Sequence, residues 1–239
     1  RVGVSARLAR VALAEWSGEA VEAIEEAWHA IAPPYEPLFA WLEGKAARPD
    51  PKSTPIFRPL MLAHPLEEAD LAALDPSAYR AEWKWDGIRV QLSAGPGGQR
   101  LWSRGAEDIS ANFPEMMNGL DFHAVLDGEL LVRGEVQGGE AASFNALQQR
   151  LGRKNVTAAM QAEYPVFVRL YDILFDGAED LRGQPWIARR DRLELFTANL
   201  DPVRFDVSAV IEARDFDHLA EIRAAAREAA IEGVMLKRR

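Results

Sequence analysis

The spacing of apolar residues predicts two helices near the start of the chain. Residues 6–16 and 21–31 carry apolar side chains three and four positions apart, as one buried helix face requires. Pro33 and Pro34 follow and should end the second helix, because proline lacks an amide hydrogen and clashes with the preceding turn. The composition then shifts toward Pro, Lys, Ser and Thr between residues 46 and 56. We therefore expect a helical segment over 1–50, a linker over 51–56 and a second domain over 57–239.

Beyond the linker, short β-type stretches alternate with turns and helices. Residues 89–93, 100–103, 124–132 and 166–175 are rich in β-branched and aromatic residues, and Ala-Gly-Pro-Gly-Gly separates the first two as a hairpin turn would. Helical spacing appears at 144–151, 186–198 and 216–230, with Ser143 and Asp215 available as N-caps. The pattern predicts an α+β fold of antiparallel sheets with flanking helices, preceded by a small all-helical segment.

Composition narrows the class of protein. With 239 residues and 48% hydrophobic content, the chain can bury one large core and still carry a smaller unit. It contains no cysteine, which excludes disulfides and cysteine-ligated zinc. No apolar run approaches the roughly 20 residues that span a bilayer, and the N-terminus has no signal-like apolar stretch. We expect a soluble cytoplasmic protein without membrane contact.

The charge distribution leaves two interpretations open. A net charge of −9 argues against a protein that coats nucleic acid, since such binding uses Lys and Arg to replace phosphate counterions. Basic residues nevertheless cluster, either as solvated faces or as a local basic groove. The clusters are Arg150, Arg153 and Lys154; Arg182, Arg189, Arg190 and Arg192; and residues 237–239.

Candidate chemistry centres on Lys84, within Glu-Trp-Lys-Trp-Asp-Gly-Ile-Arg. In an extended segment, Glu82, Lys84 and Asp86 point to one side and Trp83 and Trp85 to the other. An unprotonated lysine amine is a nucleophile that forms covalent intermediates. Taken alone, Lys-x-Asp-Gly also suits an exposed strand lysine, because chance supplies it in about one protein of this size in twenty.

Other motifs accompany Lys84 in a fixed order, and through them the chain resembles the bacterial ATP-dependent DNA ligases, which are covalent nucleotidyltransferases. The matching segments are residues 57–63 (Phe-Arg-Pro-Leu-Met-Leu-Ala), 84–89, Ser103-Arg104, 126–130 (Leu-Asp-Gly-Glu-Leu), 170–174 (Leu-Tyr-Asp-Ile-Leu) and 232–237 (Glu-Gly-Val-Met-Leu-Lys). Residues 1–50 are similar to the last part of the helical DNA-binding domain of such ligases. Residues 57–239 are similar to their adenylation domain.

The resemblance implies a mechanism and a set of site residues. Lys84 attacks the α-phosphate of ATP to form lysyl-AMP, AMP passes to the 5′-phosphate of a DNA nick, and the 3′-hydroxyl displaces it; Asp86 is a second catalytic candidate. The implied nucleotide-binding residues are Glu82 at the adenine edge, Tyr171 stacked on adenine, Arg89 and Arg104 near ribose, phosphate or nicked strand, Glu129 near the ribose, and Lys237 on a phosphate oxygen. Glu232 and Glu129 are the preferred ligands for Mg²⁺, with Mn²⁺ as an alternative, and Asp86 ranks third.

Departures from the family pattern qualify this hypothesis. The lysine-bearing fifth motif and the OB-fold domain have no counterpart in the sequence, so we expect nucleotide capture without complete sealing. An RNA ligase or an mRNA-capping enzyme also uses Lys-x-Asp-Gly, and a non-catalytic nucleic-acid-binding module would keep the fold; an NAD-dependent ligase is disfavoured by the missing zinc-binding cysteines. As partner we expect nicked double-stranded DNA in the bacterial cytosol or nucleoid, bound by a monomer without sequence preference.

Overall fold

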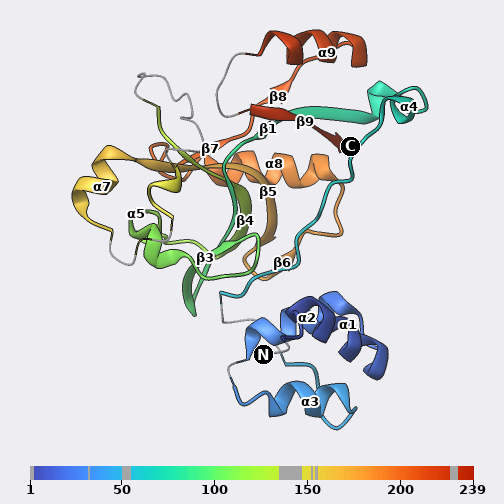
Figure 1. The fold of residues 1–239 in the computed structure, drawn as a ribbon, viewed down its shortest axis with the longest axis vertical. Coiled ribbons are helices and arrows are strands. Elements are labelled where there is room, and N and C mark those ends of the chain that lie inside the picture. Colours follow the sequence, from blue (N-terminus) through green and yellow to red (C-terminus); the bar gives the residue numbers. More distant parts are fainter. Residues whose placement is uncertain are drawn as a thin grey trace.

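The structure, a computed structural model, describes residues 3–31, 33–49, 55–134, 147–151, 153, 156–226 and 231–239. A small helical unit lies at one end, and a larger part built on two sheets forms the rest (Figure 1). The helices are α1 (Ala6–Ser17), α2 (Val21–Ala30), α3 (Glu36–Leu42), α4 (Glu68–Leu71), η1 (Pro76–Ala78), η2 (Ser110–Asn112), α5 (Pro114–Met117), α7 (Ala158–Glu163), α8 (Trp186–Thr197) and α9 (Phe216–Ala225). The strands are β1 (Tyr79–Trp85), β2 (Ile88–Gly95), β3 (Gly98–Ser103), β4 (Ala124–Val132), β5 (Val166–Asp176), β6 (Glu179–Asp180), β7 (Phe205–Val207), β8 (Val210–Ile211) and β9 (Ile231–Arg238).

The helical unit confirms the two helices that apolar spacing predicted. The Ser5 hydroxyl caps α1 by accepting from the Leu8 amide at 3.2 Å, and Gly18 ends that helix in the left-handed conformation, φ 78°. The sequence did not predict α3, whose seven residues are too few to display a period. Buried residues of α2 and α3 form the core of the unit: Ile24, Ala27, Leu38, Trp41 and Leu42.

The larger part contains two sheets. The six-stranded sheet runs β3-β2-β4-β5-β6, with β7 added alongside β5, and the three-stranded sheet runs β8-β1-β9. All four predicted strands are present, and the antiparallel prediction holds for every pair except β5 with β7, which is parallel. The main core is made chiefly by side chains of β2, β4 and β5, with α8 packed against β5.

The three helices predicted in this part have different outcomes. Helix α8 confirms the one expected over 186–198. Helix α9 begins after Asp215, whose side chain accepts from the His218 amide, but it ends at Ala225 because Ala226 is extended. The rest of that prediction, 227–230, lies outside the described residues. Of the helix expected over 144–151, the cap Ser143 and residues 144–146 also lie outside them, residues 147 and 148 are helical, and 149–151 form a turn. No helix in the described ranges is long and apolar enough to cross a membrane.

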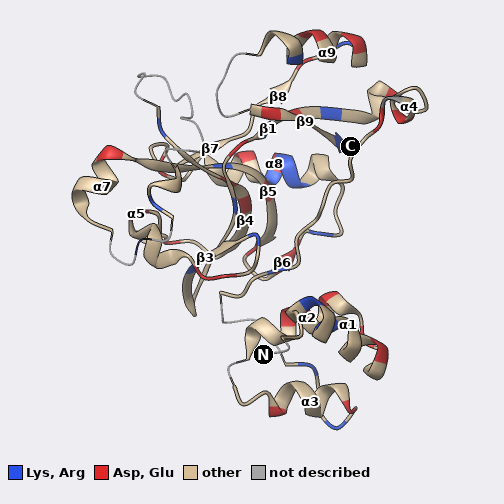
Figure 2. Ribbon diagram, viewed as in Figure 1, with Lys and Arg blue, Asp and Glu red and all other residues tan. Residues whose placement is uncertain are grey.

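Three arginines assigned to basic clusters are buried, so neither a solvated face nor a basic groove describes them. Arg150 is 0% exposed, and Arg189 and Arg190 on α8 are below 10%. Arg150 donates to the carbonyls of Asn112 and Tyr164 and pairs with Glu115 at 2.7 Å. Figure 2 shows basic residues within α8, beside the strands that it covers. Each of these guanidinium groups pairs with an acid elsewhere in the sequence, so removing one partner would leave a buried charge uncompensated.

One carboxylate joins the helical unit to the larger part. Glu26 on α2 is buried and pairs with Arg48 at 2.9 Å, with Arg58 at 3.3 Å and with Arg182 from the turn after β6. The Arg58 guanidinium also lies 4.2 Å from the centre of the Phe175 ring, so it stacks on β5 while it binds Glu26. The junction is therefore both ionic and aromatic.

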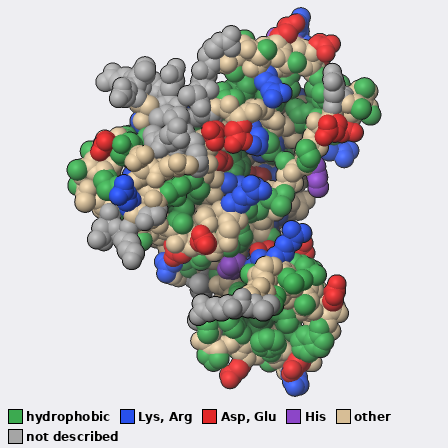
Figure 3. All heavy atoms as spheres, viewed as in Figure 1, with side chains coloured by type: hydrophobic (Ala, Val, Ile, Leu, Met, Phe, Trp, Pro, Cys, Tyr) green, Lys and Arg blue, Asp and Glu red, His purple; other side chains and the backbone are tan. Residues whose placement is uncertain are grey.

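Apolar side chains also lie on the outside of the helical unit. Figure 3 shows them gathered on the face turned toward the viewer. Val4, Leu8 and Trp16 are each more than half exposed, and Phe39 is 44% exposed. Together they give α1 and α3 an apolar outer surface.

His29 lies among aromatic rings near the junction. Its ring is 5.5 Å from that of Phe57 and 6.1 Å from that of Trp102, and its Nε2 atom has no hydrogen-bond partner among the residues that the structure describes. Burial, together with the nearby charge of Arg10, lowers the pKa of His29 to about 4. The neutral ring is therefore the form that the fold accommodates.

We expect acid to weaken the fold through His29. Its pKa is lower in the folded chain than in the unfolded chain, so its contribution is complete above about pH 6.5 and is lost as the pH falls toward 4. At pH 5 the loss should be about 1 kcal/mol, discounted because the ring is only partly buried, or roughly 2–4 °C in melting temperature. Thermal unfolding of the wild type and of His29→Phe at pH 7.5 and pH 5 checks this. Equal pH shifts in the two proteins would contradict it.

Candidate functional site

Strand β1 places Glu82 and Lys84 on one face and the indoles on the other, as alternation predicts. Glu82 is 1% exposed, whereas half of the Lys84 side chain is exposed. Trp85 is buried with Leu131 and Phe167 on the opposite face. The strand ends at Trp85, and Asp86 follows in a bend, so strand alternation does not fix the direction of Asp86.

Glu232 contacts Lys84 because β9 carries a bulge. Lys84 pairs with Gly233 and Trp85 pairs with Ile231, which leaves Glu232 without a partner on β1. In a regular ladder Glu232 would oppose Trp85 and point to the apolar face. The bulge instead directs the Glu232 side chain toward the Lys84 amine, with which it forms an ion pair, and Ile231 packs beside Trp85.

Glu82 lies at the back of the site between two cations. One carboxylate oxygen accepts from Arg190 at 3.3 Å, and the other is 4.0 Å from the Lys237 amine. Burial raises the pKa of Glu82, although Lys237, Arg190 and a hydrogen bond from the Ser208 hydroxyl oppose it. Lys237 lies within β9, opposite Arg80, on the same face as Glu82.

Arg89 is held by Asp127, a carboxylate that the sequence motifs did not single out as a site residue. Asp127 is 1% exposed and accepts from Arg89 at 2.5 and 3.3 Å, and Arg89 also donates to the Met61 carbonyl at 3.0 Å. Burial alone would lower the pKa of Arg89, but Asp127 outweighs it and raises that pKa. Strand alternation offered a signal, since Asp127 and Glu129 lie on the same face of β4.

Glu129 lies opposite Arg89 in the ladder between β2 and β4. Burial raises the pKa of Glu129 to about 8, although Arg89, a hydrogen bond from the Gly87 amide and Lys84 oppose the rise. Glu129 and Glu232 thus both lie within electrostatic reach of Lys84. The described residues contain no cluster of three or more His, Asp or Glu that would hold a metal alone.

Tyr171 is also an unpaired strand residue. Asp127 pairs with Asp172 and Gly128 with Leu170, so Tyr171 occupies a bulge in β5. Its ring lies 5.0 Å from the Lys237 amine and 5.9 Å from the Arg89 guanidinium. An aromatic ring between two cations is suited to a flat, anionic ligand.

Two glycines permit the close packing of these strands. A Cβ atom on Gly87 would lie 2.5 Å from the Leu130 carbonyl oxygen, and one on Gly128 would lie 2.8 Å from the Arg169 carbonyl oxygen. Both distances are too short for carbon and oxygen in contact. The glycines of Lys-x-Asp-Gly and Asp-Gly-Glu are therefore required for the approach of backbone to backbone.

The structure brings together most, but not all, of the predicted residues. Glu82, Lys237, Tyr171 and Arg89 form one connected set, and a second contains Lys84, Glu232 and Glu129 with Arg89. Arg104 is exposed in the turn after β3. It follows Ser103, which pairs with Val90, so Arg104 is next to the end of the ladder on the side of Arg89. Neither Arg104 nor Asp86 forms a side-chain hydrogen bond or ion pair within the described part of the chain.

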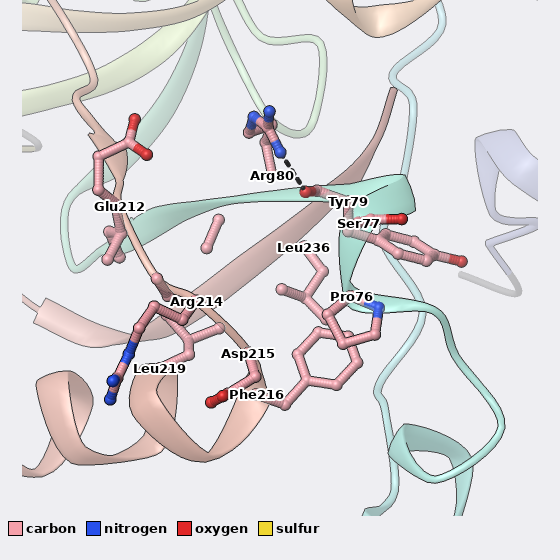
Figure 4. A pocket seen from close by; sticks show the side chains of 13 residues that line it. Pro76, Ser77, Tyr79, Arg80, Glu212, Arg214, Asp215, Phe216, Leu219 and Leu236 are labelled. Carbon is pink, nitrogen blue, oxygen red and sulfur yellow. Dashed lines mark hydrogen bonds between the residues drawn. The ribbon is translucent and has the colours of Figure 1, made fainter.

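Two pockets border the three-stranded sheet. One, of about 610 Å³, is lined by Lys84 and Glu232 together with apolar residues of α9. The other lies between β1, β8 and α9, where Phe216 and Leu236 form an apolar wall and Arg80 donates to the Tyr79 carbonyl (Figure 4). None of the predicted site residues lines this second pocket, so the candidate chemistry lies outside it.

Comparisons with known proteins agree with the geometry. A family model described as ATP dependent DNA ligase domain matches residues 60–239. The DNA ligase of Methanothrix thermoacetophila is 30% identical over 244 residues, covering 99% of this chain and 42% of that protein. The probable DNA ligase of Koribacter versatilis is 37% identical over 144 residues, covering 58% of this chain and 24% of that protein. The solved structure of mycobacterial DNA ligase D complexed with ATP and MES has a TM-score of 0.54 at 28% identity, covering 71% of this chain and 51% of that chain.

These matches confirm the resemblance that the ordered motifs indicated. The chain spans less than half the length of either relative, at 24% and 42%. The family model nevertheless matches the chain from Leu60 to its last residue. The chain belongs to the family of ATP-dependent DNA ligase domains.

Proposed function

We propose that this chain carries the nucleotide-capture step of an ATP-dependent DNA ligase, with Lys84 as the nucleophile. The observation that carries the proposal is the contact between Lys84 and Glu232, which lie 148 positions apart and meet beside the set formed by Glu82, Lys237 and Tyr171. An exposed strand lysine would not require a bulge that turns a carboxylate toward it.

The chemical step follows from the lysine amine. The unprotonated Nζ atom of Lys84 attacks the α-phosphorus of ATP, a phosphorus–nitrogen bond forms, and the bond to the bridging oxygen breaks with release of pyrophosphate. AMP then passes to the 5′-phosphate of a nick in double-stranded DNA, and the 3′-hydroxyl displaces AMP to seal it. Contacts to phosphates should make DNA binding independent of sequence.

The remaining residues bind and orient the nucleotide. Tyr171 stacks on the adenine, Glu82 accepts from its amino group, and Lys237 holds a phosphate oxygen. Arg89, fixed by Asp127, and Arg104 are placed to contact ribose, phosphate or the nicked strand. Asp86 stays a candidate second catalytic residue.

The carboxylates beside Lys84 suit a magnesium ion. Mg²⁺ usually takes one or two protein carboxylates and completes its shell with water and substrate phosphates, so a cluster of three is not required. Glu232 and Glu129 would hold it, with Mn²⁺ as a substitute, and Glu129 would also reach the ribose. When bound, the ion neutralises charge that develops on the phosphates.

The helical unit fits a DNA-binding role beside this site. We infer that residues 1–50 are the last part of a helical DNA-binding domain, 51–56 the linker and 57–239 the adenylation domain. The separate core of α2 and α3 supports this division.

The intact mass of the purified chain after incubation with Mg²⁺ and ATP, GTP or NAD tests the proposal. An adduct of one AMP from ATP, labile in acid and mapped to Lys84, is the expected result. An adduct from GTP alone would point to a capping enzyme, and an adduct from none of the three would refute nucleotide capture by this chain.

Tyr171→Ala should weaken ATP binding without removing the nucleophile. Loss of one base–aromatic stack costs about 1–3 kcal/mol, which raises the half-saturating ATP concentration roughly 5- to 150-fold. Tyr171→Phe keeps the ring and should stay close to the wild type. Titration of adduct formation against ATP concentration measures both variants, and an unchanged Tyr171→Ala curve would remove the stacking role.

A further inference from the structure

We propose that Arg190 is a positioning residue that sets the base specificity of the site by holding Glu82 in one orientation. This inference rests on the proposed function, and it concerns a side chain on α8 that faces Glu82 from behind. Arg190 lies outside the ordered motifs that accompany Lys84.

Hydrogen bonds hold the guanidinium of Arg190 in one orientation. Its guanidinium donates to the Glu82 carboxylate at 3.3 Å, to the Ser208 carbonyl at 2.6 Å and to Glu194 at 2.6 Å. Arg190 is 7% exposed and Ser208 is 0% exposed. A buried guanidinium that donates to three acceptors cannot turn without leaving at least one of them unpaired.

Ser208 completes the network. Its hydroxyl oxygen accepts from the Trp85 indole at 3.1 Å and its hydrogen bonds to Glu82. Arg190 and Ser208 therefore engage Glu82 from the interior, and the indole that anchors Ser208 belongs to the same strand as Lys84.

Arg190 contacts one oxygen of the Glu82 carboxylate, and the other oxygen faces Lys237. That oxygen is 4.0 Å from Lys237, whose amine lies above the Tyr171 ring. A carboxylate oxygen at this place accepts from an amino group, as on adenine, and repels a carbonyl oxygen, as on guanine. Without Arg190, Glu82 would close on Lys237 and lose this discrimination.

The experiment compares ATP and GTP in wild type, Arg190→Met and Arg190→Lys. We expect Arg190→Met to raise the half-saturating ATP concentration about tenfold or more, the loss typical of one charge-assisted hydrogen bond. The maximal rate of adduct formation should stay within about twofold, because the reacting groups are untouched. The ATP-to-GTP preference should fall by the same factor, and Arg190→Lys should recover part of it.

Arg189→Met is the matched control. Arg189 is equally buried on the same helix, but it pairs with Asp172 at 2.8 and 2.9 Å rather than with Glu82. The Arg189→Met substitution should lower the stability of the fold and leave the preference for ATP over GTP unchanged. An unchanged ratio in folded Arg190→Met, or an equal fall in Arg189→Met, would overturn the inference.

Equilibrium binding separates this inference from the proposed function. Dissociation constants of ATP and GTP for the same four proteins measure base preference without any covalent step. A wild type that binds ATP in preference to GTP but forms no adduct would refute nucleotide capture while the Arg190 comparison still decides the inference. A wild type without preference between the two nucleotides would refute the inference directly.

Discussion

Lys84→Arg is expected to abolish the covalent nucleotide altogether. Arginine keeps the positive charge that pairs with Glu232, so the local electrostatics change little. Its guanidinium stays protonated at every accessible pH and therefore offers no lone pair to the α-phosphorus. The intact mass after incubation with ATP and Mg²⁺ should show only the unmodified chain, against nearly complete conversion of the wild type.

The control for this variant is Lys45→Arg. Lys45 is a solvent-exposed lysine of the helical unit that pairs with Glu43. The Lys45→Arg variant should form the AMP adduct to the same extent as the wild type. Retention of covalent AMP by Lys84→Arg would show that another residue is the nucleophile and would contradict the proposed mechanism.

Arg150→Met should cause the largest loss of stability. The substitution keeps the volume but leaves the carbonyls of Asn112 and Tyr164 and the carboxylate of Glu115 without their donor. Breaking a buried pair in this way costs about 3–5 kcal/mol. Thermal unfolding should show a fall of roughly 10 °C in melting temperature.

Arg153→Met removes the same charge three residues away. Arg153 is exposed and, among the described residues, its side chain donates only to the Gln149 carbonyl, so its loss should change stability by about 0.5 kcal/mol or less. Equal melting temperatures for the two variants would show that the interior tolerates the loss of the Arg150 guanidinium.

The regular elements were predictable because each repeats a period over several residues. Strand β4 covers the residues that the apolar run indicated, and α8 and the start of α9 follow their helical spacing and cap. Helix α3 was not predicted because it is shorter than two periods. The β5–β7 pairing was not predicted because two strands far apart in sequence carry no sign of their relative direction.

The site was predictable only as a set of residue types. Ordered motifs identified Lys84, Glu129 and Glu232, but their mutual arrangement depends on a bulge that strand alternation does not predict. The buried arginines were misjudged for a related reason. Arg150 and Glu115 lie 35 positions apart, and Arg190 and Glu82 lie 108 apart. Local sequence patterns do not indicate which distant charges form pairs in the fold.

The bulge in β9 makes the length of that strand as important as its composition. Removing either Ile231 or Glu232 would restore an uninterrupted ladder opposite Trp85, with every later pair from Gly233 onward in its present register. The residue opposite the indole would then be the acid or the strand would have no acid at all. Residues of similar character can replace one another along β9, but an insertion or deletion near Glu232 would separate the carboxylate from the amine it faces.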